Sequence, residues 1–371
     1  MTDDDDIGEM LRDSAASFIQ ARFDPHSLRG EIDGVRAIDR ALWSEMAKLG
    51  WLAVLLPEAM GGLGASLRAA NILAEIFGRA AFQQPFVAAA VIPSTLLAQC
   101  QGAAASKIAT ELLSGETVVT LAWQSAADDF DPRFDGAELG SGGLSGAKRF
   151  VPAVEEEGRL IVSATRNGEP VLVAVDAAAP AVRISRHRST LIGLADVEFH
   201  GVTEFVVLAE GKAARTALSR AIEAGRVALA AQASGLLAGA LDRTIAHVSQ
   251  RVQFDKPIGS FQSVQHRCVD QHIALQIASA SVANAASCYD SDPELAETLA
   301  AISSAKARAC DAALAAGTLG VQLHGAMGFT EEAEIGHYLR AAMASAAWLG
   351  SSPAHRRRFI SHRAPRESVH G

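Results

Sequence analysis

The apolar pattern of this chain changes twice along its 371 residues, and these two changes restrict the possible folds more than any other feature. Up to about residue 115, apolar side chains recur at helical spacing, as in Leu42 and Met46. Between 116 and 210, short β-branched runs alternate with glycines and acidic turns, which is typical of strands. The helical period then returns. The sequence therefore predicts a mainly α protein with a β domain in the middle, divided into residues 1–115, 116–210 and 211–371.

One C-terminal stretch, residues 296–321, is apolar on nearly all sides. A helix of a globular domain normally buries a single apolar face, so a second apolar face indicates a contact between subunits. This stretch therefore predicts an oligomer.

Charge and cysteine content argue against several classes of protein. The net charge of -9 and the pI near 5.7 speak against nucleic acid as a partner, because phosphate binding needs a clustered basic surface. The N-terminus has no basic and apolar segments of a signal peptide, and no apolar run suits a membrane span, so we expect a cytoplasmic protein. Four widely spaced cysteines predict buried thiols and no metal site: Cys100, Cys268, Cys288 and Cys310.

Four segments carry recognisable motifs, in order along nearly the whole chain. They are LWSEMAKLGWLAVLLPEAMGGLG (42–64), LSGAKRFV (144–151), QRVQFDKPIGSFQ (250–262) and QLHGAMGFTEE (322–332). Through them the chain resembles the acyl-CoA dehydrogenase family, in which the third segment reads R.QFGKPIGSFQ. The resemblance implies an N-terminal helical domain, a middle β-barrel-like domain and a C-terminal four-helix bundle. It also implies FAD as cofactor and α,β-desaturation of an acyl-CoA thioester.

In this family the third and fourth segments reach the FAD of the neighbouring subunit. A guanidinium holds a pyrophosphate bidentately, an aromatic ring offers an apolar face to adenine, and glycines let backbone amides approach phosphate or ribose. A solvated charge at the arginine and plain helix ends at the glycines are the alternatives. The resemblance implies these cofactor residues, called the lent half-site below: Arg251, Phe254, Gln262, Gln322, Gly325 and Gly328.

The resemblance also locates the catalytic base, a carboxylate that removes the α proton while a hydride leaves for the flavin. Its usual position, in a turn near the C-terminus, is Leu349 here, and its alternative position, early in a helix and just before an arginine, is Gly225. Neither side chain can accept a proton. Glu223 is the remaining candidate, with an exposed first-turn carboxylate as the alternative. Arg226, the family's arginine, is expected either to order the acyl site or to form an ion pair.

Other departures fall on the segments that face a subunit's own flavin ring. The segment that reads TEP.AGS in the family is here Leu121–Ser125, the strand ending in ITNG is here 151–154, and the glutamine after the catalytic turn is Pro353. Asp255 also replaces the glycine of QFGKP. The half of the flavin site that the chain would build for itself is therefore degraded, whereas the lent half-site is intact.

This asymmetry favours the non-catalytic subunit of an actinobacterial heteromeric acyl-CoA dehydrogenase, a chain that completes the FAD site of a base-bearing homologue. A homo-oligomeric dehydrogenase that uses Glu223 as its base is a second hypothesis, and a redox-inactive acyl-CoA-binding scaffold is a third. A flavin oxidase or monooxygenase on the same fold also fits the motifs.

Overall fold

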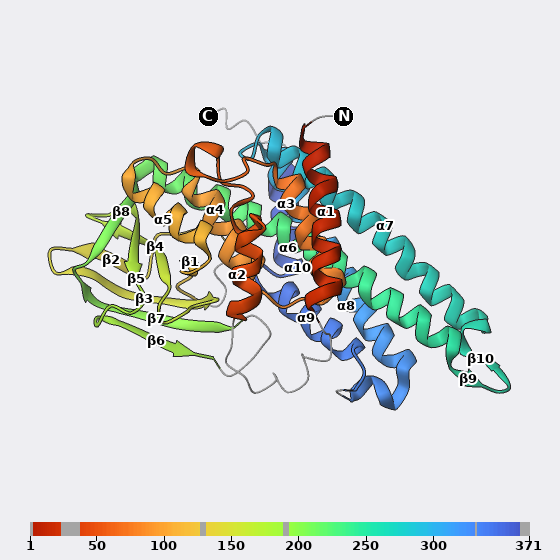
Figure 1. Cartoon of the computed structure of the whole chain (residues 1–371). Helices are drawn as coiled ribbons and strands as arrows, with labels where there is room; N and C mark the ends of the chain where they lie inside the picture. Colours follow the sequence, from red (N-terminus) through yellow and green to blue (C-terminus); the bar gives the residue numbers. More distant parts are fainter. Residues whose placement is uncertain (1–2, 24–37, 127–130, 188–192, 331, 364–371) are drawn as a thin grey trace.

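The structure, a computed structural model, describes residues 3–23, 38–126, 131–187, 193–330 and 332–363. Helices come first, an eight-stranded sheet follows, and helices return to the end of the described chain, so the expected order is confirmed. In Figure 1 the sheet lies at one end of the molecule, and one long helix runs from it through the centre to the other end.

Side chains cap the first turns of α2 (Arg40–Lys48) and α3 (Leu67–Arg79), and a glycine follows the end of α2. The Asp39 carboxylate accepts hydrogen bonds from the backbone N–H groups of Ala41 and Leu42 at 2.9 and 3.1 Å. In the turn after Pro57, a Cβ at Gly62 would lie 2.2 Å from the Leu56 carbonyl oxygen, so a side chain has no room there. The elements are α1 (Asp3–Arg22), α2 (Arg40–Lys48), η3 (Trp51–Ala53), η4 (Glu58–Met60), α3 (Leu67–Arg79), the π-turn η5 (Val87–Val91), α4 (Ile92–Leu97) and α5 (Ala103–Ser114).

The middle region is one sheet with the strand order β6-β7-β3-β2-β4-β5-β8, and β1 pairs with β4 in parallel. The fully buried ammonium of Lys148, on β3, donates to Ser163 Oγ at 3.0 Å and to the Trp123 carbonyl oxygen at 3.1 Å, which joins the end of β1 to the sheet. The strands are β1 (Val119–Ala122), β2 (Ala137–Gly140), β3 (Gly143–Pro152), β4 (Arg159–Arg166), β5 (Glu169–Asp176), β6 (Val182–Arg186), β7 (Leu194–Val202) and β8 (Phe205–Glu210).

The C-terminal region is a bundle built around the longest helix, α6. This helix is long and apolar enough to cross a membrane, but 94% of its most apolar window is buried inside the protein, as expected of a core helix. The elements are α6 (Gly211–Gln250), the two-stranded β9 (Val252–Gln253) and β10 (Lys256–Pro257), η6 (Ile258–Ser260), α7 (Gln262–Ser291), α8 (Ala296–His324), η7 (Gly325–Phe329), α9 (Ile335–Ala347) and α10 (Ser352–Arg363).

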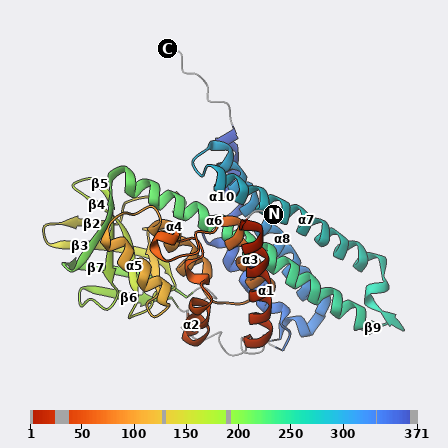
Figure 2. The same cartoon turned by 45° about the horizontal axis from the view of Figure 1, so that its top comes forward.

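The N-terminal helices and the bundle share one core because α3 and α6 cross with their backbones in contact. A Cβ at Gly78 would lie 2.0 Å from the Gln232 carbonyl oxygen, and one at Gly235 would lie 2.0 Å from that of Glu75. Figure 2 shows α3 beside α6, with α1 packed outside it. The crossing leaves no room for a side chain at either glycine.

The apolar stretch 296–321 lies inside the bundle rather than between subunits. It forms most of α8, which packs against α6, α7, α9 and α10, so its all-round apolar character serves this chain's own core. The exposed apolar side chains lie on α7 instead. Val269, Ile273 and Ile277 recur at four-residue spacing on one face and are 54%, 51% and 46% exposed. Packing within one chain therefore explains the apolar pattern of 296–321, and the oligomer stays a prediction.

Candidate functional site

The two positions of the family's base meet in the structure. Leu349 follows α9 in a buried turn, with a φ of 56° that L side chains rarely adopt. A Cβ built on Gly225 of α6 would lie 3.2 Å from Leu349 Cδ1 and 2.7 Å from Ile92 Cγ1. Two residues separated by over a hundred positions therefore pack together in one apolar part of the interior, and neither supplies a carboxylate there.

Buried polar side chains, two of them cations, hold the Leu349 turn through its carbonyl groups. The Leu349 oxygen accepts hydrogen bonds from Arg226 Nε at 3.3 Å and from His355 Nε2 at 3.1 Å. Lys306 Nζ donates to the Gly350 oxygen at 3.2 Å. Each of these side chains is at least nine-tenths buried, so the turn is fixed by charged and polar groups that water does not reach.

Glu223 is not the exposed first-turn carboxylate of the sequence alternative. Helix α6 begins at Gly211, more than three turns earlier, and Glu223 is 2% exposed. Its Oε1 accepts from Arg226 Nη1 at 2.5 Å and from Arg358 Nη2 at 2.6 Å, and its Oε2 accepts from Arg358 Nη1 at 3.1 Å. The carboxylate is the shared counter-ion of two guanidinium groups, and Arg226 forms the ion pair that was its alternative role.

Burial governs the titration of this charged group. Burial, together with the charges of Arg226 and Lys306, lowers the pKa of His355 to about 2, so its imidazole is neutral at ordinary pH. Burial also lowers the pKa of Arg226, an effect that the neighbouring Glu223 carboxylate opposes.

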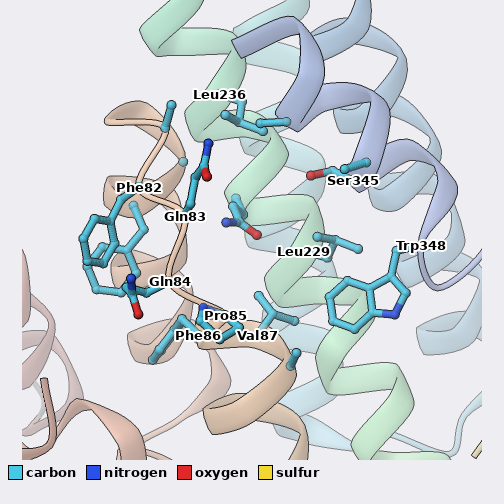
Figure 3. A pocket seen from close by; sticks show the side chains of 17 residues that line it. Phe82, Gln83, Gln84, Pro85, Phe86, Val87, Leu229, Leu236, Ser345 and Trp348 are labelled. Atoms are coloured by element: carbon cyan, nitrogen blue, oxygen red, sulfur yellow. The ribbon is translucent and has the colours of Figure 1, made fainter. Parts of the chain in front are cut away.

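A small pocket lies beside the Leu349 turn. Figure 3 shows the segment from Phe82 to Val87 facing Leu229 and Leu236 of α6, with Trp348 at the other side. The cavity volume is about 60 Å³, room for a few water molecules. Typical pockets for organic ligands measure about 300 Å³ or more, so an acyl chain would need these walls to move.

The lent half-site lies at the far end of α6, on the surface. Arg251 caps the helix and is exposed, and its carbonyl accepts the Ile258 N–H at 2.8 Å, which closes the hairpin of β9 and β10. Phe254 and Asp255 form the two-residue turn with φ of 54° and 62°. Phe254 is 85% exposed, an unusual state for an aromatic ring in a chain with so large a core.

The remaining members of the lent half-site gather around the ends of α7 and α8. Gln262 begins α7, and the exposed Gln322 accepts a hydrogen bond from Arg267 Nη1 at 3.0 Å. Gly325 ends α8 with a φ of 64° and open space around its absent side chain. Gly328 is different, because it is buried and a Cβ there would lie 2.5 Å from the Val321 carbonyl oxygen. Close packing is therefore sufficient to explain why position 328 is a glycine.

The segments that would face the chain's own flavin ring are packed inside the chain. Leu121 and Trp123 are buried, and the Gln124 backbone carbonyl accepts the Arg149 N–H at 2.8 Å. Ala153 and Val154, which follow strand β3, are fully buried. The side chains present at these positions do not fit a flavin ring, whereas the exposed arginine, phenylalanine and glutamines of the lent half-site fit a dinucleotide.

Sequence reasoning missed Lys306 and His355, which bond the Leu349 turn, and Arg358, which pairs with Glu223. Arg358 belongs to an Arg-Arg-Arg run on α10, whose first two members are exposed, so only the fold distinguishes the buried one. Pro353 lies in the first turn of the same helix, a position that tolerates proline well. Among the residues that the structure describes, no three His, Cys, Asp or Glu side chains gather as a metal site.

Two family models match the chain over most of its length. They are "Acyl-CoA dehydrogenase, N-terminal domain" over residues 5–116 and "Acyl-CoA dehydrogenase, C-terminal domain" over residues 214–363. The chain belongs to the acyl-CoA dehydrogenase family, whose members bind FAD.

Individual relatives agree with this assignment. The acyl-CoA dehydrogenase IpdE2 of Mycobacterium tuberculosis is 28% identical over 344 residues, 92% of this chain and 93% of that protein. A variant of the Tcur3481-Tcur3483 steroid acyl-CoA dehydrogenase has a TM-score of 0.82 at 28% identity and covers 96% of this chain and 97% of its own. The ChsE4-ChsE5 complex of Mycobacterium tuberculosis shares the fold, with a TM-score of 0.84 at 22% identity over 98% and 99% of the two chains.

Proposed function

We propose that this chain is a subunit of a heteromeric, FAD-dependent acyl-CoA dehydrogenase and removes no proton itself. It completes the flavin site of a base-bearing homologue, and the complex desaturates an acyl-CoA in the cytoplasm. The relatives named above include a complex of two chains and a steroid enzyme, which favours a bulky acyl group.

The observation that carries the proposal is the difference in exposure between the two halves of the flavin site. Trp123 and Val154 are packed in the chain's own core and present no face to a flavin ring. Arg251 and Phe254 lie on the surface, beside the apolar face of α7. A chain that kept its own flavin would need both halves, whereas a chain that serves a partner needs only the second.

The surroundings of Leu349 support the absence of a base in this chain. Leu349 packs against Gly225 and Ile92, so the side chains at both positions of the family's base are surrounded here by aliphatic groups. Glu223 is the one carboxylate we considered as a displaced base, and both its oxygens already accept hydrogen bonds from guanidinium groups. Using it as a base would break a buried ion network, which opposes the homo-oligomeric alternative.

The test is to purify the chain alone and after co-expression with a homologue that has Glu or Asp at the position matching Leu349 or Gly225. We expect little flavin absorbance from the chain alone, and a yellow complex that reduces an electron acceptor with acyl-CoA present. Arg251→Ala should lower the flavin content of the complex, because this guanidinium would hold the pyrophosphate. The matched control is Arg357→Ala, an exposed arginine on α10.

Each alternative function predicts a different outcome of these experiments. A yellow and active homo-oligomer would overturn the proposal, and a Glu223→Gln variant that stays folded and keeps its flavin but loses activity would then identify the displaced base. A chain that assembles with the homologue but leaves its flavin content unchanged in Arg251→Ala would be a scaffold instead. Oxygen consumption with acyl-CoA present would identify an oxidase.

A further inference from the structure

Two imidazole rings lie face to face where α6 and α8 end. The ring centroids of His247 and His324 are 4.0 Å apart and their planes differ by 22°. Both residues adjoin members of the lent half-site. The Arg251 N–H donates to the His247 carbonyl oxygen at 2.9 Å, and His324 lies between Gln322 and Gly325 in sequence. The stack is therefore the contact that joins the two helix ends carrying these residues.

Backbone contacts fix both rings to the last turn of α8. His324 Nδ1 lies 2.7 Å from the Gly320 carbonyl oxygen, so in the neutral ring that nitrogen carries the proton. The backbone of Leu323 hydrogen-bonds His247. His247 belongs to α6 and His324 to α8, and both rings are bonded to the last turn of α8. If the rings separate, the distance between the end of α6 and the end of α8 changes.

The charges around the stack make it sensitive to protons. Burial has the largest effect on His247 and lowers its pKa, and the charges of His324 and Arg251 lower it further. The surroundings therefore favour the neutral form of the ring. Arg267, on α7, adds a third cation next to Gln322. Two protonated rings at stacking distance, beside two guanidinium groups, would repel each other. Neutral rings attract each other through stacking, so protonation of His247 would weaken the stack.

We propose that His247 and His324 are a positioning pair for the lent half-site. While the rings are stacked, they hold Arg251 and Gln322 at the spacing that the partner's flavin requires. Protonation of His247 separates the rings and releases both residues, so the complex loses flavin as the pH falls. This inference rests on the proposed function, but its structural part concerns the isolated chain alone.

The first experiment follows backbone amide resonances of the isolated, isotope-labelled chain by NMR between pH 8 and pH 5. We expect the Arg251 and Gln322 amides to shift with the midpoint of the His247 ring, below the ordinary histidine value. In His247→Phe, which keeps a stacked ring that cannot be protonated, these shifts should vanish. Arg251 and Gln322 amides that ignore the His247 titration would overturn the positioning role, whatever the chain's function.

The second experiment measures assembly and flavin content of the complex by sedimentation at pH 7.5 and 5.5. One linked proton changes the dissociation constant by up to about tenfold for each pH unit below the titration midpoint. The wild-type complex should weaken accordingly, and His324→Phe should remove most of that dependence. His200→Phe, an exposed histidine of β7, is the control. A complex with equal pH dependence in wild type and His324→Phe would refute the pair and leave the proposed function standing. Failure to assemble at any pH would refute the proposed function, and the amide titration would then decide the pair alone.

Discussion

At the scale of residues, the charged side chains near Leu349 serve the structure of the chain. Glu223, Arg226 and Arg358 form a buried network in which one carboxylate serves two guanidinium groups. Such networks contribute little net stability as wholes, but removal of one member leaves uncompensated charge in a dry interior.

Glu223→Gln should therefore destabilise the folded chain strongly. The loss removes the carboxylate that pairs with Arg226 and Arg358 in the interior, and we expect the free energy of unfolding to fall by about 3 kcal/mol or more. Urea denaturation followed by circular dichroism measures it. Glu204→Gln, at an exposed carboxylate, is the matched control and should change little. If both variants unfold at the same urea concentration, Glu223 has no structural role.

The neutral, buried imidazole of His355 predicts a dependence of stability on pH. Its pKa is about 2 when folded and near 6.5 when unfolded, so the unfolded chain binds the proton more readily below 6.5. The contribution of His355 to the free energy of unfolding is fully present above pH 6.5. Below pH 6.5 it declines by up to about 1.4 kcal/mol for each pH unit. His355→Gln keeps a donor for the Leu349 carbonyl and should reduce this slope between pH 6.5 and 5. Equal slopes in urea titrations of both proteins would contradict the prediction.

At the scale of elements, the hairpin of β9 and β10 accounts for the one departure inside the strongest motif. Asp255 replaces the family's glycine at a φ of 62°, and aspartate tolerates this left-handed region better than most residues. The tight turn also explains why the adjoining Phe254 projects from the surface.

Asp255→Gly should stabilise the chain by about 1 kcal/mol, because glycine adopts the left-handed conformation without steric cost. The midpoint of urea unfolding reports the change. Asp255→Ala removes the same carboxylate but keeps a Cβ, so it should give no stabilisation. A gain of equal size in both variants would assign the effect to charge rather than to backbone conformation.

At the scale of the whole molecule, the apolar face of α7 should bind another subunit. Val269, Ile273 and Ile277 present aliphatic side chains in a row on the surface, which is costly in a monomer.

Ile273→Glu should therefore weaken assembly with the partner by tenfold or more without lowering the stability of the chain. Burial of one carboxylate in an apolar interface costs about 1.4 kcal/mol or more, equivalent to that factor. Sedimentation velocity on mixed subunits measures it. Ile360→Glu, at a 65% exposed position on α10, should leave assembly unchanged. Equal weakening by both variants would show that charge alone, and not this face, matters.

The sequence predicted the order of helical and β regions well, because the patterns that specify helices and strands are local in the sequence. Alternation and helical period fix strands and helices, and the turn around Gly62 and the hairpin after Arg251 need particular residues at particular places. The environment of Glu223 could not be predicted, since it depends on Arg358, over a hundred residues away, and on a helix that begins earlier than its motif indicated. The burial of residues 296–321 inside the bundle could not be predicted either, because apolar periodicity does not tell which of two neighbouring helices lies inside.

The contact between Leu349 and Gly225 has a consequence for the evolution of this family. Side chains at the two positions meet in the interior, so a carboxylate could be supplied from either position without a change in where the substrate lies. In this chain a side chain at 225 would collide with Ile92, whereas a side chain is already accommodated at 349. A revertant that regains proton abstraction should therefore carry Leu349→Glu rather than Gly225→Glu, and selection for growth on acyl-CoA precursors could reveal which.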